Sequence, residues 1–297
     1  MADAPDKKVS KPQTKAKGFK PDVATAAGIG LAMAGILGGL VLEKGSIQDV
    51  AQTTAAMIVL GGTFGAVLVT TPLSVFIQAM KELRHVFFEQ ASAASEIIDT
   101  LINFATQARK NGIVSLESVT ETIEDPFLKK ALNLAVDGTD LNELRKMMEI
   151  DIELGEQAQE QKAKVWEAAG GYSPTIGIIG AVMGLIQVMK HLDDIKEVGH
   201  GIAVAFVATV YGVGVANILF LPSANKLRAR IQRARLIKEL MLEGVTGIVE
   251  GLNPTLIRMK LEAFDQEPAK AAGKAQAKGK DKAPARAGAP QTAPAGD

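Results

Sequence analysis

The residues that could do chemistry in this chain are hydroxyl groups set in two long apolar stretches. Residues 171–189 and 201–225 contain no Asp, Glu, Lys or Arg, yet they carry the hydroxyls of Thr175, Thr209 and Tyr211. Hydroxyl oxygens can line a path for an ion, or they can bond to backbone carbonyls within their own helices. Proteins that move ions across a membrane usually hold an ionisable group inside it. A conducting role would therefore require a partner that supplies a carboxylate.

No arrangement typical of an enzyme accompanies these hydroxyls. Cys is absent, the three His lie far apart, and neither a Gly-rich phosphate loop nor a Ser/His/Asp set occurs. We expect no catalytic residue, no metal, no resident cofactor and no nucleic-acid partner. The glycines include the spacing Gly180-x-x-x-Gly184, which lets membrane helices approach closely.

Four blocks without charged residues predict an all-α, polytopic membrane protein with four transmembrane helices. A hydrocarbon core about 30 Å thick needs roughly 20 apolar residues in a helix. Between spans two and three, apolar residues at helical spacing predict a helical cytoplasmic region, and the Lys-, Ala- and Pro-rich ends predict disordered tails. The predicted order is a tail at 1–22, spans at 23–42 and 51–80, the cytoplasmic region at 81–165, spans at 171–189 and 201–225, a cytoplasmic helix at 226–265 and a tail at 266–297.

The distribution of Lys and Arg predicts how the spans are oriented. Six Lys precede the first span, and six Lys and Arg follow the fourth span between Lys226 and Lys238. Because cytoplasmic flanks carry the excess of Lys and Arg, both termini and residues 81–165 are expected in the cytoplasm. Trp166 and Tyr172 would then lie at the cytoplasmic membrane interface, where such amphipathic rings collect.

Local signals predict where helices begin and bend. Pro174 follows a serine, a pair that is typical of a helix start. Pro222 comes late in the fourth span, where its missing N–H should kink the helix. In the cytoplasmic region, Thr139 or Asp140 with Glu143 nearby predicts a further helix start.

Three segments of the chain resemble one family. GYSPTIGIIGAVMGLIQVM (171–189) and GIAVAFVATVYGVGVANILFLPSANKL (from 201) are similar to spans three and four of the MotA/PomA stator subunits of the bacterial flagellar motor. The cytoplasmic segment ARKNGIVSLESVTETIEDPFLKKAL (108–132) is similar as well. So is the order of the spans, with a tight first hairpin and a cytoplasmic region before span three.

The resemblance implies a function, partners and a location. Members form a homo-pentameric ring in the inner membrane around two copies of a MotB-like subunit. That subunit has a single span with an ion-carrying Asp and a peptidoglycan-binding domain. Ion flow past that Asp drives torque on the rotor switch protein, and membrane lipid surrounds the ring.

The resemblance also carries roles onto particular residues of this chain. Arg109 and Glu117 match the charges that face the rotor, and Pro174 and Pro222 match two prolines needed for torque coupling. Thr209 matches a hydroxyl that lines the ion path. Sodium-driven members resemble Gly-Thr where this chain has Gly180-Ala181. Because the missing hydroxyl removes an oxygen ligand that sodium would favour, Ala181 favours protons as the driving ion.

Two alternatives compete with the stator interpretation. An ExbB/TolQ-like energiser of outer-membrane processes shares the last two spans, but it has three spans and places its large cytoplasmic region after the first. The tight hairpin between residues 42 and 51 argues against it. A structural scaffold or a solute transporter is the other alternative. Transporters often show internal repeats, and the two halves of this sequence do not repeat.

Overall fold

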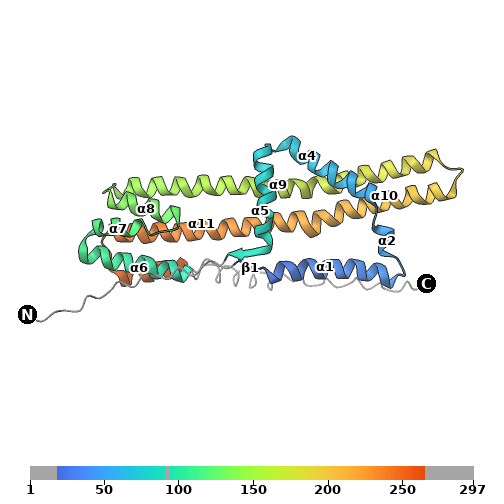
Figure 1. Cartoon of the computed structure of the whole chain (residues 1–297). Coiled ribbons are helices and arrows are strands. Elements are labelled where there is room, and N and C mark those ends of the chain that lie inside the picture. The colour runs from blue at the N-terminus through green and yellow to red at the C-terminus, as the bar shows by residue number, and fades with distance from the viewer. Residues whose placement is uncertain (1–18, 91–93, 265–297) are drawn as a thin grey trace, which may run out of the picture. The chain divides into compact units, whose positions relative to one another are not determined.

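The computed structural model describes residues 19–90 and 94–264 and is built almost wholly of helices (Figure 1). The predicted all-α class is confirmed. Within the described residues, four helices are long and apolar enough to cross a membrane: Val23–Leu42, Ile47–Thr70, Leu141–Lys190 and Ile195–Val249. Of the predicted disordered tails at 1–22 and 266–297, residues 1–18 and 266–297 lie outside the described residues. The prediction is wrong for residues 19–21, which form a short strand.

The elements follow one another with short connections. In order they are β1 (Phe19–Pro21), α1 (Val23–Leu42), α2 (Ile47–Val50), α3 (Thr53–Ala56), the π turn η1 (Met57–Gly61), α4 (Gly62–Thr70), α5 (Leu73–Phe87), β2 (Phe88–Gln90), α6 (Ala94–Asn111), the 3₁₀ turn η2 (Ile113–Leu116), α7 (Glu117–Thr120), α8 (Pro126–Val136), α9 (Leu141–Lys190), α10 (Ile195–Val215), the π turn η3 (Ala216–Phe220) and α11 (Leu221–Val249). Residues 254–264 form one more helical segment. The two short strands, which the sequence did not predict, pair antiparallel with Phe19 opposite Gln90.

The chain divides into two compact units. Unit 1 comprises the described parts of Met1–Ser92 and Glu149–Arg235, and so holds the apolar parts of all four spans. Unit 2 comprises the described parts of Ala93–Met148 and Leu236–Asp297.

The block predicted as span two, residues 51–80, is not one helical region. Helix α4 ends at Thr70, and α5 begins at Leu73 and runs at a steep angle to α9 (Figure 1). The break lies at Thr71, which is extended, with φ −129° and ψ 133°. Pro72 causes it, because a proline disfavours helical backbone in the residue before it. The candidate span is therefore Ile47–Thr70, and residues 73–80 belong to a separate helix.

Helix α9 runs unbroken for 50 residues from Leu141 to Lys190. The predicted start is confirmed, with Asp140 as the capping residue: its Oδ1 accepts from the backbone N–H of Asn142 at 2.9 Å and of Glu143 at 3.4 Å. The predicted second start at Pro174 is wrong. This proline lies inside the helix, where it leaves one carbonyl without its usual helical donor. Helical residues precede it without a break, so the helix simply continues through it.

Next to Pro222, where a kink was predicted, the structure has a π turn. Pro222 is the second residue of α11, and η3 directly precedes that helix. Proline cannot donate to the carbonyl four residues earlier, which belongs to Ile218 in the middle of η3. The wider turn thus coincides with the carbonyl that Pro222 leaves unpaired.

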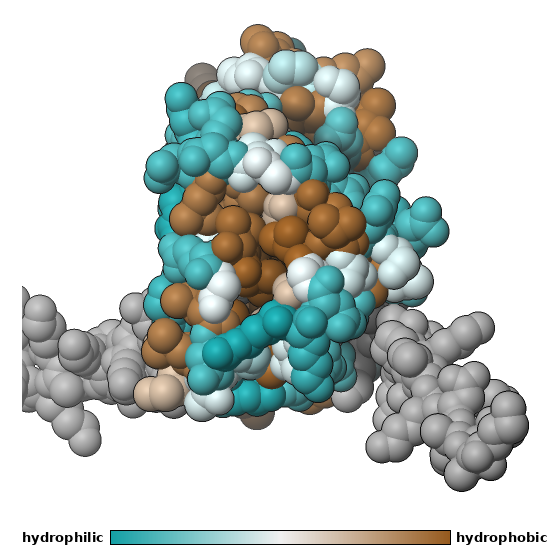
Figure 2. Space-filling view, turned by 90° about the vertical axis from the view of Figure 1, so that its left-hand side faces the viewer, coloured by the Kyte–Doolittle hydropathy of each residue, from teal (hydrophilic) through white to brown (hydrophobic). Residues whose placement is uncertain are grey.

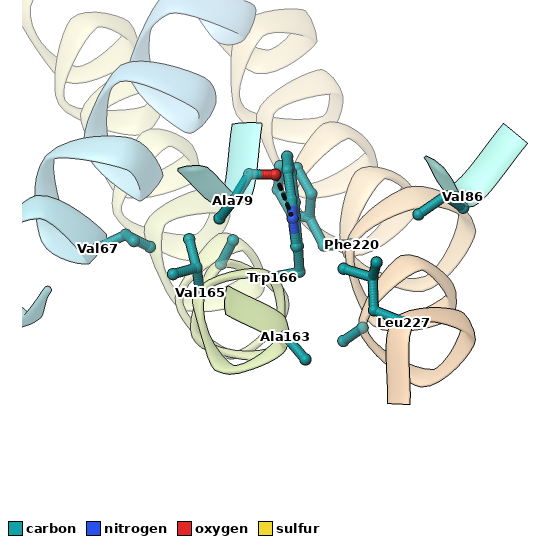
Figure 3. Close-up of a cluster of buried hydrophobic side chains, with 10 residues drawn as sticks. Val67, Ala79, Val86, Ala163, Val165, Trp166, Phe220 and Leu227 are labelled. Carbon is teal, nitrogen blue, oxygen red and sulfur yellow. Dashed lines mark hydrogen bonds between the residues drawn. The ribbon is translucent and has the colours of Figure 1, made fainter. Parts of the chain in front are cut away.

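Trp166 lies in the core of unit 1, so its ring does not face the surroundings of the protein. Its side chain is buried, its Nε1–H donates to the carbonyl of Ala79 at 3.3 Å, and its ring centroid lies 5.9 Å from that of Phe220 (Figure 3). Val67 from α4 and Leu227 from α11 belong to the same buried cluster, against which the partly buried Tyr172 packs. The predicted interfacial role of Trp166 is therefore wrong, since its ring joins α5, α9 and α11.

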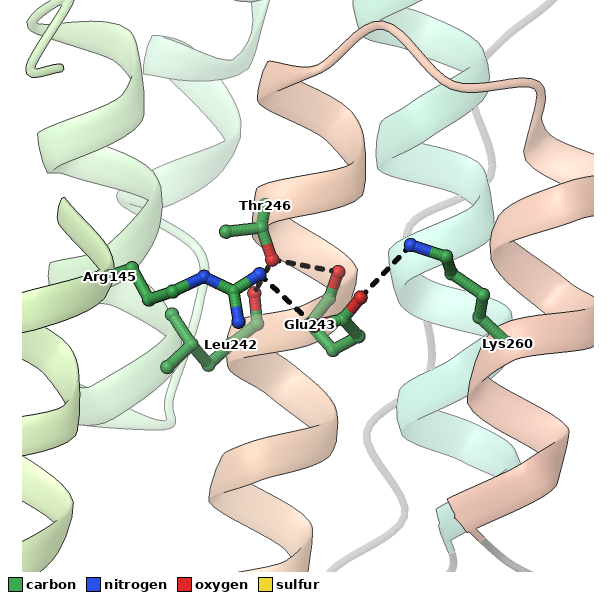
Figure 4. A network of polar contacts seen from close by, with 5 residues as sticks. All are labelled: Arg145, Leu242, Glu243, Thr246 and Lys260. Atoms are coloured by element: carbon green, nitrogen blue, oxygen red, sulfur yellow. Dashed lines mark hydrogen bonds and ion pairs between the residues drawn. The ribbon is translucent and has the colours of Figure 1, made fainter. Parts of the chain in front are cut away.

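Unit 2 is held together by buried apolar residues and by a polar network around Glu243. One carboxylate oxygen of Glu243 accepts from Arg145 at 3.3 Å and the other from Lys260 at 3.1 Å (Figure 4). The hydroxyl of Thr246 donates to the carbonyl of Leu242 at 2.6 Å. The start of α9, the end of α11 and the 254–264 helix are thereby linked through one carboxylate.

Candidate functional site

Helices α9 and α10 pack backbone against backbone through glycines. A Cβ on Gly177 would lie 2.9 Å from the carbonyl oxygen of Ala208 and 3.0 Å from the Cα of Gly212. A Cβ on Gly184 would lie 2.7 Å from the carbonyl oxygen of Gly201. These facing pairs run in opposite directions along the two helices, so the pair is antiparallel. The close approach is the packing that the spacing Gly180-x-x-x-Gly184 predicted.

Ala181 and Thr209 lie on the same side of this helix pair. They directly follow Gly180 and Ala208, which face each other: a Cβ on Gly180 would lie 2.8 Å from the Cβ of Ala208. Each residue of a right-handed helix turns by about 100°. In two antiparallel helices, the residues that follow a facing pair therefore project to the same side. Exposed apolar side chains, such as that of Phe206, share this side, which we call the open side.

Span two covers the opposite side of the pair. Ala55 and Val59 form a buried cluster with Val207 and Ala208 there. Tyr211 packs against this cluster, and its hydroxyl donates to the carbonyl of Val50 at 2.6 Å. Tyr211 was predicted to line the ion path beside Thr209, but the structure places it against span two.

The remaining predicted hydroxyls bond within their own helices. Thr209 is half-buried, and its hydroxyl donates to the carbonyl of Ala205 at 3.2 Å. Thr175 is exposed and donates to the carbonyl of Tyr172 at 2.8 Å. Because Thr175 precedes Gly177 by two residues, it points away from α10. Of the three hydroxyls, only that of Thr209 shares the open side with Ala181.

The two prolines lie in different surroundings. Pro174 precedes Ala181 by seven residues, about two helical turns, so it lies on the open side. Pro222 is exposed and lines a cavity with residues of α1. The structure therefore brings Pro174, Ala181 and Thr209 to one side and leaves Pro222 apart.

Arg109 and Glu117 flank a tight turn in unit 2. Gly112 forms this turn with φ +82°, a conformation that favours glycine, and Gln107 donates to the carbonyl of Ser115 at 2.9 Å. Both charged side chains are exposed. Arg109 also lines a cavity of about 330 Å³ with Ile113 and residues of α8 and α11. Figure 2 looks at unit 2, which includes α6, α7 and α8, and hydrophilic residues frame an apolar hollow on this face.

Ion pairs that the sequence does not indicate join α9 and α11 in unit 1. Arg228 donates to Glu160 at 2.8 Å and to Glu167, and Arg235 donates to Glu156 at 2.6 Å. The hydrogen bond from Arg228 lowers the pKa of Glu167. These partners are 61 to 79 residues apart in sequence, so no local pattern could indicate them.

A second charged cluster lies where α1 begins. Asp22 caps α1 by accepting from the backbone N–H of Thr25 at 3.1 Å, and it forms ion pairs with Lys226 and, at 3.7 Å, with Arg230. The hydrogen bond from Lys226 lowers the pKa of Asp22 to about 2. The carboxylate thus stays ionised at neutral pH although it is buried.

These features define a helical, multi-pass membrane protein whose two glycine-packed spans expose a side without ionisable groups. Comparison with known proteins agrees. The model of the MotA/TolQ/ExbB proton channel family matches residues 119–240, and the model of the motility protein A N-terminal region matches residues 26–112. The chain is 35% identical to motility protein A of Bacillus subtilis over 242 residues, which cover 81% of this chain and 89% of the relative. It is 32% identical to chemotaxis protein PomA of Vibrio alginolyticus, with 83% and 96% covered.

Solved structures give the same result. The structure of C. jejuni MotAB matches with a TM-score of 0.77 and 36% identity, over 82% of this chain and 95% of that chain. The flagellar MotAB stator complex from Bacillus subtilis matches with a TM-score of 0.75 and 34% identity, over 81% and 95%. The chain therefore belongs to the motility protein A family of flagellar stator channels. The predicted stator function is confirmed, and the ExbB/TolQ-like alternative is set aside, because the N-terminal match is specific to motility protein A.

Proposed function

We propose that this chain conducts protons together with a MotB-like, single-span subunit and converts their flow into torque. The observation that carries the proposal is the open side of α9 and α10. It aligns Pro174, Ala181 and Thr209, and neither 171–189 nor 201–225 contains a carboxylate. A span that brings an Asp against this side would supply the ionisable group that conduction needs.

We further propose that copies of the chain assemble as a homo-pentamer in the bacterial inner membrane, with both termini in the cytoplasm. No residue of α1 is buried within the chain, and Leu31 and Leu42 are 77% and 86% exposed. Such apolar helices fit contact with lipid or with neighbouring copies. The orientation rests on the Lys- and Arg-rich flanks of spans one and four.

The driving ion can be tested in a strain that lacks the gene. Without it, cells should carry intact but motionless filaments, and the gene should restore swimming. In rescued cells we expect swimming to persist without sodium and to stop when a protonophore collapses the proton gradient, because Ala181 offers no oxygen ligand. Tracking swimming speed against sodium concentration measures this. A speed that depends on sodium would refute the choice of ion, whereas normal swimming of the deletion strain would refute the torque function unless a second stator set is present.

We propose that Arg109 and Glu117 steer the rotor switch protein. Both are exposed, and Arg109 borders a cavity that could receive a partner's side chain. An exposed ion pair contributes only about 1 kcal/mol or less to binding. The charges would therefore mainly guide the approach of the two proteins and their alignment, and add little to the affinity. Arg109→Glu and Glu117→Lys should each slow or stop swimming while the complex still assembles.

The matched controls are Lys110→Glu and Glu121→Lys, which reverse exposed charges close by. We expect them to change swimming much less. Co-purification with the MotB-like subunit reports assembly for all four variants. Loss of assembly in Arg109→Glu or Glu117→Lys would refute the assignment of these residues to the rotor interface and would indicate a structural role.

A further inference from the structure

A cavity of about 290 Å³ lies between the first turns of α1 and the junction of η3 with α11 in unit 1. We call it the α1 groove. Its lining includes Gly28, Ile29 and Ala32 from α1, together with Ile218, Pro222 and Lys226. A Cβ built on Gly28 meets no atom within 4 Å, so the groove is open beside this glycine. The walls are mostly apolar, with polar side chains from Thr25, Asn217 and Ser223 and the charged side chain of Lys226.

The length of the groove matches one leaflet of a bilayer. Its α1 residues run from Ala24 to Ala32, a distance of about 12 Å at 1.5 Å per residue. Half of a hydrocarbon core about 30 Å thick is about 15 Å. Within a membrane, the surrounding material that fits a groove of this length and polarity is a lipid acyl chain.

The charges at the groove's end favour an anionic headgroup. Asp22 caps α1 there and is 7% exposed, and its single carboxylate pairs with both Lys226 and Arg230. The side chain of Lys226 remains 36% exposed. Two cations against one carboxylate leave a net positive charge where the first span meets the headgroup region, and each Lys or Arg near a membrane surface attracts anionic lipid.

We propose that the α1 groove binds one anionic phospholipid, with an acyl chain between α1 and α11 and the phosphate at Lys226. This inference requires that the chain spans a membrane and is independent of which ion it conducts. A bound lipid would fill the gap beside Pro222, and so would link α1 to the π turn that precedes α11.

The test uses the full chain with its MotB-like subunit, reconstituted into vesicles of phosphatidylcholine with phosphatidylglycerol as the minor component. Native mass spectrometry then counts the phosphatidylglycerol molecules that stay bound after gentle extraction. Gly28→Leu should fill the groove and abolish this retained lipid. Gly30→Leu is the matched control, because it adds the same side chain to α1 at a position that does not line the groove and has no atom within 4 Å. Equal retention in the two variants would overturn the proposal.

Two charge variants test the headgroup contact. Lys226→Gln should lower the preference for phosphatidylglycerol over phosphatidylcholine roughly fivefold. Asp22→Asn, which still offers a capping oxygen to α1, should raise this preference. A preference that is the same in both variants and in the parent would overturn the phosphate contact.

Photocrosslinking separates lipid from a second copy of this chain. With p-benzoylphenylalanine in place of Ile29, which lines the groove, we expect adducts with phospholipid. A crosslink between two copies of the chain would show that a neighbouring copy fills the groove, and would overturn the proposal.

Discussion

Gly212→Ala should abolish swimming, whereas Gly214→Ala, two residues further along the same span, should leave it intact. A Cβ on Gly212 would lie 2.7 Å from the carbonyl oxygen of Ser173 and 2.9 Å from the Cα of Gly177. Both are backbone atoms of α9, so no side-chain rotation relieves the clash and the two helices must separate. A Cβ on Gly214 meets no atom within 4 Å.

The contrast between these two variants isolates packing from helix propensity. Alanine favours a helix over glycine by about 1 kcal/mol at either position, so Gly214→Ala should be neutral or slightly stabilising. Overpacking a tight interface typically costs about 1–3 kcal/mol. At Gly212 the forced separation would also shift Thr209 relative to Ala181. These two residues directly follow Ala208 and Gly180, which face each other across the contact.

Three measurements distinguish the outcomes for Gly212→Ala. An immunoblot of membranes gives the amount of chain, co-purification gives assembly with the MotB-like subunit, and tracking gives swimming speed. We expect reduced assembly and no swimming. Normal swimming with normal assembly would mean that the helices tolerate a methyl group at their closest approach, and the rigid α9–α10 contact would have to be abandoned.

The sequence indicates where apolar spans lie, although not the bounds of the second, because the uncharged composition that a membrane requires is visible within each stretch. A stretch such as 23–42 has no charge over its whole length, which is sufficient to identify it. Whether a helix continues through a given residue depends on more than the residues beside it. The serine before Pro174 is typical of a start, yet residues 141–173 are already helical and carry the helix through the proline. At Pro72 the same residue type ends a helix, because the residue before it is extended.

The sequence suggests hydroxyl residues for the candidate site, but it does not show on which side of the helix each of them lies. Thr209 and Tyr211 lie two positions apart and project in very different directions. Nothing in the apolar stretch 201–225 tells which of them meets span two, since nearly all faces of the helix are apolar. The rotation of α10 is fixed by Gly177, Gly184 and their partners, and these pairings join residues well apart in sequence. Only the folded contact places Tyr211 against Val50.

Trp166 is an aromatic residue whose contacts the sequence likewise could not indicate. Its position five residues before the predicted third span suits an interfacial ring. Its burial depends on α5, which turns away from the second span at Pro72 and brings the carbonyl of Ala79 to the indole N–H. When residues 51–80 are taken as one span, no separate helix is left to cover this ring.

Trp166→Ala should destabilise unit 1 by about 3–5 kcal/mol, the usual cost of removing a buried large aromatic side chain. The ring is 1% exposed and packs with Phe220, which in turn lies 5.8 Å from Phe64 between ring centroids. Its loss would leave a cavity where α5, α9 and α11 meet. Trp166→Phe keeps most of the ring and loses the hydrogen bond to Ala79, so a smaller loss, about 1 kcal/mol from that bond, is expected.

Thermal stability of the complex carrying a fluorescent-protein fusion, read by size-exclusion chromatography after heating, avoids reliance on the single Trp of the chain. The midpoint should fall furthest for Trp166→Ala and less for Trp166→Phe. Leu154→Ala is the control, because this large apolar side chain lies on the same helix but is 60% exposed, and such surface changes usually stay within about 0.5 kcal/mol. If Trp166→Ala were as stable as Leu154→Ala, Trp166 would not join the three helices. Such a result would favour the original prediction that the ring faces the membrane interface.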